Sequence, residues 1–463
     1  MFKSFFNTLV NCFKIEELKT RIFFTLGLLF VCRLISLIPV PGLDGAKLSS
    51  YFAELSKKSQ GADAGVLGMY SMFTGGALEN CAIGSLGIMP YISATIILQL
   101  LGAVIPQLAK LAREEGGRAK LIQYGRYLTL LLCLGQGFAM ALGWENPEKI
   151  FQSYDKGVLV MADNIWWYRI QTMLILTTGT MLLMWLGEQI TERGIGNGVS
   201  LVITIGILAR LPQAAQSLLD MFKSVDDGGA GKTIFHAIAL GLMLLVVVGV
   251  VIAVTQAQRK IPVQYAQRAV GRKVYAGGSS FMPLRVNYAG VMPIIFAQAI
   301  LMFPQKLLEL LGKSLDLPLL ISLGDKLSYG TVGYLVFEAF MILFFSYFWV
   351  ATQFNETQIA DDLKKYGGYI PGVRPGGATS DFLHHAMSRI TLAGAIFLMA
   401  IAVFPTVLSD SMDVNFAVAQ FFGGTSILIT VGVMLDTMRQ VESHLLMRHY
   451  DGFLKKGRVK GRS

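Results

Sequence analysis

The sequence predicts an all-α integral membrane protein with ten spanning helices. Three observations support this class. The 463 residues are 53% hydrophobic and only 15% charged, whereas soluble domains average ~25% charged residues. Ten apolar runs are long enough, or nearly so, to cross ~30 Å of hydrocarbon. Lys and Arg gather in alternate connections between these runs, which is typical of a chain that crosses a membrane repeatedly. A soluble enzyme, a disordered chain and a disulfide scaffold are excluded.

The predicted spans are apolar on all sides, as suits helices in lipid, where backbone polar groups must be bonded internally. The fifth and ninth spans are short. A further apolar stretch, about 66–78, is too short to cross and is predicted to be a half-spanning helix. The ten spans cover residues 22–41, 81–105, 121–142, 165–186, 195–209, 234–256, 286–305, 330–353, 390–405 and 417–437.

The basic residues orient these spans. With a cytoplasmic N-terminus, 27 of the 40 Lys and Arg residues fall in or beside cytoplasmic segments, and positive loops stay on the cytoplasmic side. Both termini are therefore predicted to be cytoplasmic. The predicted organisation is an N-terminal segment (1–21), a first half (22–209), an external hinge loop (210–233), a second half (234–437) and a basic tail (438–463).

Two large cytoplasmic loops are candidates for partner binding. Residues 257–285 carry six basic residues and no acid, so this loop can contact RNA phosphates or an acidic protein surface. Lipid headgroups are the alternative ligand. Residues 354–389 are rich in glycine and proline around Pro371–Gly377. Projecting loops of this kind carry function more often than packing.

No catalytic residue, metal site or cofactor site is predicted. Gly231-Lys232-Thr233 imitates the end of a phosphate-binding loop, but Asp226 stands where that loop needs glycine. The glycine-rich run 194–198 joins two spans, so a tight connection explains it better than dinucleotide binding. His444 and His449 are five residues apart, which is poor spacing for metal ligands. The four cysteines are too dispersed to indicate a disulfide framework or a zinc site.

Polar side chains inside the predicted spans are costly and often functional. Arg33 and Glu338 are the charged examples. Each is either functional or structural, as part of a satisfied pair or as a residue that faces a cavity. Gln99, Gln136 and Gln298 recur in spans as well, where hydrogen bonding between helices is the ordinary explanation.

Several stretches resemble the SecY-type family of bacterial protein-conducting channels. The run MWLGEQITERGIGNG at 184–198 is highly specific for the connection between spans four and five of that family, and the resemblance extends over nearly the whole chain. The other stretches are FTGGAL at 73–78 followed by LGIMPYIS at 86–93, NYAGVMP at 287–293, PGVRPG at 371–376 and FGGTS at 422–426.

The resemblance implies two pseudo-symmetric five-helix halves, arranged as a clamshell around a water-filled hourglass. A plug helix closes the hourglass from outside, and a ring of aliphatic side chains forms its waist. A lateral gate opens to lipid between spans two/three and seven/eight. The implied function is conduction of unfolded secretory polypeptides across the bacterial plasma (inner) membrane, with lateral release of transmembrane segments.

By position, the resemblance assigns six residues to the pore ring: Ile88, Ile92, Val199, Ile203, Ile295 and Ile429. Two pairs among them are four residues apart, so each pair shares a helix face. A ring of stiff, apolar, β-branched side chains can exclude ions by dewetting. Ordinary packing is the alternative explanation for such isoleucines in spans.

The remaining assignments also come from the resemblance. The plug, about 66–78, includes Val66, Met69, Met72, Phe73, Gly75 and Gly76, and Gln99 and Gln298 are placed at the lateral gate. The residues expected to dock a motor or a ribosome are Arg259, Lys260, Arg268, Arg272, Lys273 and Arg374.

The implied partners are the small membrane subunits SecE and SecG. The chain has no ATPase motif, so the driving force is expected from the SecA motor ATPase or a translating ribosome. Glu338 stands where the family has small or apolar residues, and the resemblance gives it no role. A secondary transporter for a small solute remains the alternative, because ten spans in two halves also suit that class; a membrane-embedded enzyme ranks third.

Overall fold

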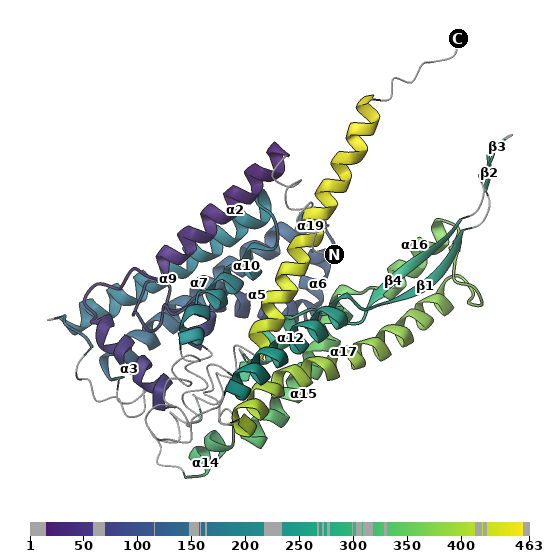
Figure 1. Ribbon diagram of the computed structural model, residues 1–463. Helices are drawn as coiled ribbons and strands as arrows, with labels where there is room; N and C mark the ends of the chain where they lie inside the picture. The colour runs from purple at the N-terminus through teal and green to yellow at the C-terminus, as the bar shows by residue number, and fades with distance from the viewer. Residues whose placement is uncertain are drawn as a thin grey trace. The chain divides into compact units, whose positions relative to one another are not determined.

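The computed structural model describes residues 15–58, 70–147, 164–216, 234–298, 318–327, 331–412 and 424–456, with short gaps in these ranges and a few isolated positions between them. The chain forms two compact units. The first comprises Met1–Lys223 with Ile429–Ser463, and the second Ser224–Leu428. Helices dominate both units (Figure 1). Among the described residues, six helices are long and apolar enough to cross a membrane, which agrees with the predicted multi-spanning class.

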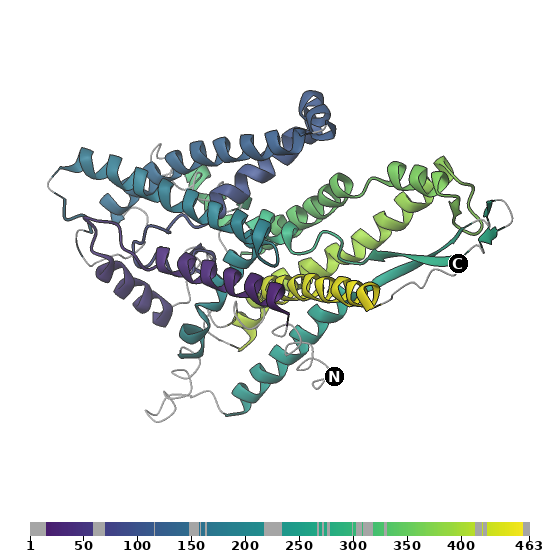
Figure 2. The ribbon, with the colours of Figure 1, turned by 90° about the horizontal axis from the view of Figure 1, so that it is seen from above.

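The described part of the first unit consists mainly of helices joined by turns and isolated bridges. Helix α7 packs along α9, α5 packs along α7, and α2 lies beside α9 (Figures 1 and 2). Helix α19 contributes its residues from Ile429 onward to this unit. The helices are α2 (Glu16–Ile35), α3 (Gly45–Lys58), α5 (Met89–Val104), α6 (Pro106–Arg113), α7 (Gly117–Glu145), α9 (Ile165–Arg193), α10 (Gly198–Leu208) and α19 (Thr425–Lys456).

The core of the first unit includes the amphipathic helix α3. Its buried residues Leu48, Tyr51 and Phe52 follow the spacing of one helix face. They join a cluster with Trp144 of α7 and Tyr168 of α9. A segment that hydropathy places outside the membrane spans is thereby fixed to two of the long helices.

The second unit combines helices with a small sheet. Strand β1 (Gln258–Tyr265) pairs antiparallel with β4 (Ser279–Arg285) and with β5 (Gly368–Tyr369), in the order β4-β1-β5. The short strands β2 (Arg268–Val270) and β3 (Lys273–Tyr275) pair with each other. The helices are α12 (Ile234–Gln256), α14 (Pro318–Lys326), α15 (Val332–Gln353), α16 (Glu356–Lys365) and α17 (Gly377–Met412), together with the helical segment 292–298.

The sheet joins residues 257–285 and 354–389, which the sequence predicts as two large cytoplasmic loops. Ile261 and Val263 alternate with exposed residues along β1 and are buried, as in a strand with one covered face. Ile261 packs in a cluster with Ile370, beside β5, and Leu383 of α17. The two segments therefore form one body, which we call the cytoplasmic body (residues 257–285 and 354–389) after its predicted location.

The first helix and the predicted half-helix end earlier than predicted. Helix α2 ends at Ile35 rather than near residue 41. Prolines 39 and 41 disfavour its continuation, and Pro39 instead bridges to Ala82. The predicted half-helix 66–78 is helical only over 70–73 in its described part. Gly75 and Gly76 have φ of 65° and 85°, a left-handed conformation that ends helices.

Other bounds differ in both directions, because hydropathy reports local composition and not backbone geometry or packing. The predicted span 81–105 is helical only from Met89. Helix α17 begins at Gly377, well before the predicted span 390–405. Its first turns are amphipathic, and Leu383, Ala386 and Met387 pack in the core of the cytoplasmic body. Tertiary packing therefore extends α17 beyond its membrane-like stretch.

Candidate functional site

The predicted ring residues of α5 and α10 lie on regular local structure. Ile88 is the N-cap residue of α5, one position outside the helix, and its carbonyl accepts a 3.2 Å hydrogen bond from the Ile92 N–H. Val199 and Ile203 lie one turn apart on α10. Ile88, Ile92 and Ile203 are buried, and Val199 is half-buried.

The other two ring residues lie on different elements. Ile429 belongs to α19 and to the first unit, and it is 1% exposed. Ile295 lies in the helical segment 292–298 of the second unit and is buried. A complete ring needs residues from both units, so the ring itself remains a prediction.

The segment 70–80 packs on the α10 face that carries Ile203. A Cβ atom on Gly75 would lie 2.9 Å from the Cα of Gly206, which is three residues beyond Ile203 and so on the same face. A Cβ atom on Gly87, the residue before Ile88, would lie 3.2 Å from Thr74. The turn at 74–75 therefore lies against α10, which carries Val199 and Ile203, and against the residue that precedes Ile88.

The predicted plug residues fall partly in this segment. Met72 and Phe73 are buried, and Gly75 and Gly76 form the turn that follows them. Val66 and Met69 lie outside the described residues.

Two arginines hold the 70–80 segment, and we call this arrangement the arginine clamp (Arg33, Arg210, Ser71, Glu79 and the Gly75 carbonyl). The Arg33 guanidinium, on α2, donates a 2.9 Å hydrogen bond to the Gly75 carbonyl. Arg210, just after α10, pairs with the Glu79 carboxylate and donates to the Ser71 hydroxyl. Ser71 in turn donates to Glu79 over 2.9 Å. Only 17% of the Arg210 side chain and 15% of the Glu79 side chain are exposed.

The arginine clamp gives Arg33 a structural role and includes Arg210, which the sequence does not predict as a site residue. Arg33, predicted as a charge within a span, has a structural partner in the backbone. Arg210 was assigned by sequence to an external hinge loop and was missed. The sequence contains one signal for a basic partner. The acidic residue Glu79 lies next to the apolar run 81–105, and a buried carboxylate needs a cation.

The glycine-rich connection 194–198 is confirmed as a tight structural link. The N–H groups of Ile195, Gly196 and Gly198 donate to the side-chain oxygens of Thr25, Gln440 and Thr191, at 3.1, 2.9 and 2.8 Å. These three acceptors belong to α2, α19 and α9. The connection therefore joins three helices at the start of α10.

Replacing Gly198 with alanine is expected to destabilise the fold severely. An added Cβ atom would lie 1.8 Å from the Gly187 carbonyl oxygen, and backbone cannot yield as a flexible side chain does. We expect a loss of more than about 3 kcal/mol, the upper end for overpacking. Thermal unfolding in detergent checks this. Gly27→Ala in α2, where nothing lies within 4 Å of the added atom, is the control, and equal losses for both variants would contradict the explanation.

The cytoplasmic body presents basic side chains to solvent. Arg259 and Lys260 are exposed on β1, opposite Leu284 and Pro283 of β4. Arg374 is exposed in the turn between β5 and α17, where its carbonyl accepts a 2.9 Å hydrogen bond from Thr379. Of the other predicted docking residues, Arg268 and Lys273 lie in β2 and β3, and Arg272 lies outside the described residues.

The predicted gate residues differ in their surroundings. Gln99 is exposed on α5 of the first unit. Gln298, in the second unit, is 4% exposed, and its Nε2 donates a 3.2 Å hydrogen bond to Oε1 of Glu338. The sequence does not indicate that Gln298 and Glu338 are partners, and the family resemblance gives Glu338 no role. The placement of Gln99 and Gln298 at a lateral gate remains a prediction.

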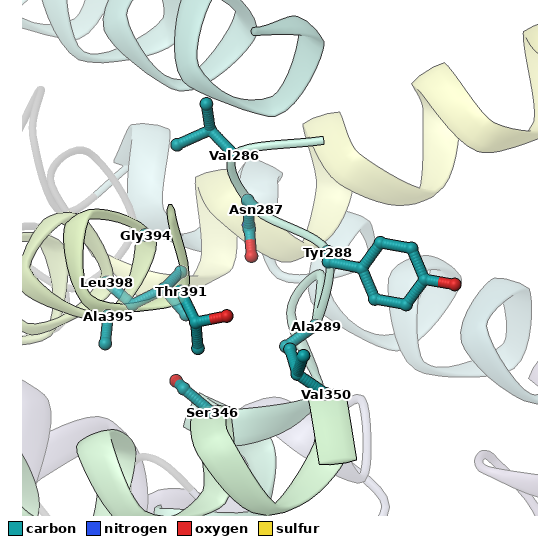
Figure 3. A pocket seen from close by; sticks show the side chains of 10 residues that line it. All are labelled: Val286, Asn287, Tyr288, Ala289, Ser346, Val350, Thr391, Gly394, Ala395 and Leu398. Atoms are coloured by element: carbon teal, nitrogen blue, oxygen red, sulfur yellow. The ribbon is translucent and has the colours of Figure 1, made fainter. Parts of the chain in front are cut away.

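A small cavity in the second unit is too small for a substrate. Its volume is ≈ 10 Å³, about that needed for one water molecule. The side chains of Asn287, Ser346 and Thr391 converge on it (Figure 3). Asn287 Nδ2 and Thr391 Oγ1 are buried without a protein partner there, so a single bridging water suits the cavity. Within the described part of the chain, no three His, Cys, Asp or Glu residues cluster as metal ligands.

Comparisons with known proteins agree with the sequence motifs. The SecY family model matches residues 82–438. The protein translocase subunit SecY of Chlamydia trachomatis is 42% identical over 98% of this chain and 99% of its own length. The subunit of the same name from Escherichia coli is 41% identical, with 96% of each chain covered.

Solved structures show the same fold. A protein-conducting channel superposes with a TM-score of 0.62 at 18% identity, covering 91% of each chain. Sec61 from a canine ribosome–channel complex of the endoplasmic reticulum gives a TM-score of 0.58 at 17% identity, again with 91% of each chain covered. Because the family model and the relatives account for nearly the entire sequence, this chain belongs to the SecY family.

Proposed function

We propose that the chain is the channel subunit of a protein translocase, which conducts unfolded secretory polypeptides across a membrane and releases transmembrane segments into lipid. One observation carries this proposal: relatives named protein translocase subunit SecY are about 40% identical over nearly the full length of both chains. The similarity of fold to a protein-conducting channel supports it. The alternative of a solute transporter is not retained, because the chain belongs to another family.

The geometry of the first unit supports a sealing role for the 70–80 segment. The proposed plug, about 66–78, overlaps this segment, which rests on the α10 face that carries Ile203. The arginine clamp holds it there through Arg33 and Arg210. An apolar constriction resists water because it offers no hydrogen bonds. Ile88, Ile92, Val199, Ile203, Ile295 and Ile429 would supply that constriction, and Gln99 and Gln298 would line the lateral gate.

The proposed partners are small membrane subunits and a source of driving force for translocation. SecE and SecG are the proposed small membrane subunits, and SecA or a ribosome is the proposed source of driving force, so the chain itself has no enzymatic role. Solved relatives of this fold include Sec61 and Ssh1 channels in complexes with ribosomes. Basic side chains on the cytoplasmic body, including Arg259, Lys260 and Arg374, suit an acidic protein or RNA partner.

The proposed location is the bacterial plasma (inner) membrane, with both termini in the cytoplasm. The six apolar helices of spanning length support a multi-pass membrane protein. The bacterial relatives support the compartment. The excess of Lys and Arg on one set of connections supports the orientation. Cysteine labelling of the two termini in intact cells and in inverted vesicles tests it.

Reversing the charge of Arg374 tests the proposed function. Arg374 is exposed at the tip of a turn whose backbone is held by Thr379, and guanidinium groups bind carboxylate or phosphate in two-point contacts. Arg374→Glu is therefore expected to abolish motor- or ribosome-driven translocation while assembly is retained. Protease protection of a secretory substrate in reconstituted vesicles measures the effect.

Two controls keep this test specific. Arg374→Lys retains the charge and is expected to keep part of the activity. Lys365→Glu reverses an exposed charge on α16, where the side chain is 75% exposed, and is expected to have a smaller effect. Full translocation by Arg374→Glu would overturn the docking assignment, and no translocation by the wild-type chain with its partners would overturn the proposed function.

A further inference from the structure

The carboxyl group of Glu338 is buried beside the amide of Gln298, and two of their four polar atoms have no partner. Glu338 is 1% exposed and Gln298 is 4% exposed. The Nε2 of Gln298 donates to Oε1 of Glu338 over 3.2 Å. The second carboxyl oxygen and the amide oxygen are both buried without a hydrogen-bond partner. Both unpaired atoms are acceptors when the carboxyl is ionised.

Among the described residues, no counter-ion lies beside this pair. Glu338 forms no ion pair with any described residue, and α15 and the segment 292–298 contain no Lys, Arg or His. The other ionisable side chains on α15 are Tyr334 and Tyr347, and Tyr347 donates to the Ser388 carbonyl.

The helices that pack against α15 do not supply a cation within the span either. Helix α14 carries Asp325 and Lys326 at its end. Helix α17 carries Asp381, His384, His385 and Arg389 before its predicted span begins at residue 390, and Asp410 near its end, with none between Arg389 and Asp410.

Apolar packing joins the two elements that carry the pair. Phe296 makes edge-to-face contacts with Phe345 and Trp349 of α15, with ring centroids 5.9 and 5.4 Å apart. Glu338, Phe345 and Trp349 follow the spacing of one face of α15. A lone carboxylate in such an interface is strongly disfavoured. A neutral carboxylic acid is tolerated there, because its O–H can donate a hydrogen bond to a buried acceptor.

We infer that Glu338 is a protonated carboxylic acid that forms a two-hydrogen-bond pair with the Gln298 amide. In this pair Nε2–H donates to Oε1 of Glu338, and the acid O–H donates to Oε1 of Gln298. The proton turns one of the two unpaired acceptors into a donor for the other, so both buried atoms are satisfied together. Glu338 is then a positioning residue that fixes Gln298 and holds the segment 292–298 to α15.

The pair of Glu338 and Gln298 also affects gating, and this consequence rests on the proposed function. If Gln298 lines the lateral gate, its helix and α15 move as one body when the gate opens. The pair itself does not depend on that role, because it follows from burial and hydrogen bonding alone.

Infrared spectroscopy tests the protonation directly. The full chain, with its small membrane subunits, is reconstituted in lipid vesicles at neutral pH, and wild type is compared with Glu338→Gln. We expect a carbonyl band of a protonated carboxylic acid that shifts in D₂O and is missing from the variant. A difference spectrum that shows only ionised carboxylate at this position overturns the inference.

A set of variants tests the pair by stability. Glu338→Gln keeps a donor and an acceptor, so it is expected to retain the melting temperature within a few degrees and translocation within about twofold. Glu338→Leu and Gln298→Leu each leave a buried polar group unpaired, and both are expected to lower the melting temperature clearly. The double leucine variant removes both groups and is expected to be no worse than either single variant.

These outcomes separate the inference from the proposed function. A loss for Glu338→Gln as large as that for Glu338→Leu, or additive losses in the double variant, would show that the neutral pair does not exist. The melting temperature and the infrared band are measured without transport, so they stand even if the chain conducts no polypeptide.

Discussion

Replacing Arg210 with glutamine is expected to raise the resting ion conductance of the channel and to permit export of substrates with defective signal sequences. Arg210 contacts Ser71 and Glu79 at the two ends of the 70–80 segment. Without its guanidinium, the hydroxyl of Ser71 is the one partner that Glu79 keeps among the described residues, in a largely buried position. The closed arrangement of the proposed plug therefore loses stability relative to any arrangement in which Glu79 reaches water.

The size of the effect follows from the burial of the pair. Hydrogen bonds to charged groups contribute about 1.5–3 kcal/mol, and both side chains are at most 17% exposed, so solvent screens them weakly. Each ~1.4 kcal/mol changes an equilibrium tenfold. The open population, while it remains minor, is thus expected to rise roughly ten- to a hundredfold.

The pair of Arg169 and Glu145 provides a matched control for this prediction. It also lies in the first unit, its atoms are 2.8 Å apart, and each side chain is 20% exposed. It does not involve the 70–80 segment. Arg169→Gln is expected to lower stability similarly without raising the leak in planar-bilayer recordings.

A charge exchange completes the test. Glu79→Arg combined with Arg210→Glu restores an ion pair and is expected to reduce the leak of either single variant. Equal leaks for Arg210→Gln and Arg169→Gln would assign the effect to general loosening rather than to the clamp.

Hydropathy predicts the spanning helices well because membrane insertion depends on local composition. It does not predict where they end. Helix α2 ends where Pro39 and Pro41 prevent its continuation, and α17 extends to Gly377 because Leu383 and Met387 pack in the cytoplasmic body. The ends are decided by backbone geometry and by tertiary packing, which a composition window does not contain.

The contacts that define the site join residues far apart in sequence, and this is why they were missed. Arg210 and Ser71 are 139 residues apart, and Gln298 and Glu338 are 40 apart. A polar residue in an apolar run indicates that a partner exists, but not which one. The sheet of the cytoplasmic body had a local signal, the alternation of Ile261 and Val263, but β5 comes from the other loop.

The pore ring differs from these contacts, because its six residues come from a family resemblance and the ring stays a prediction. Ile429→Asn tests it most directly. Ile429 is 1% exposed on α19, so an asparagine amide there has to find hydrogen-bond partners in an apolar setting. Burying an amide without them costs roughly 1–3 kcal/mol in proteins, and water is the available partner.

Ile429→Asn is therefore expected to hydrate the constriction, raise the resting conductance at least about tenfold and allow export with defective signal sequences, since ~1.4 kcal/mol suffices for a tenfold change. Ile429→Leu keeps the apolar character and is expected to do neither. Leu131 on α7 is 67% exposed, so Leu131→Asn places the same amide on an outer helix surface and is expected to leave the conductance unchanged. Planar-bilayer recordings compare the three variants. Equal conductance for asparagine and leucine at position 429 contradicts the ring assignment, whereas a leak from Leu131→Asn shows that any added amide loosens the closed state.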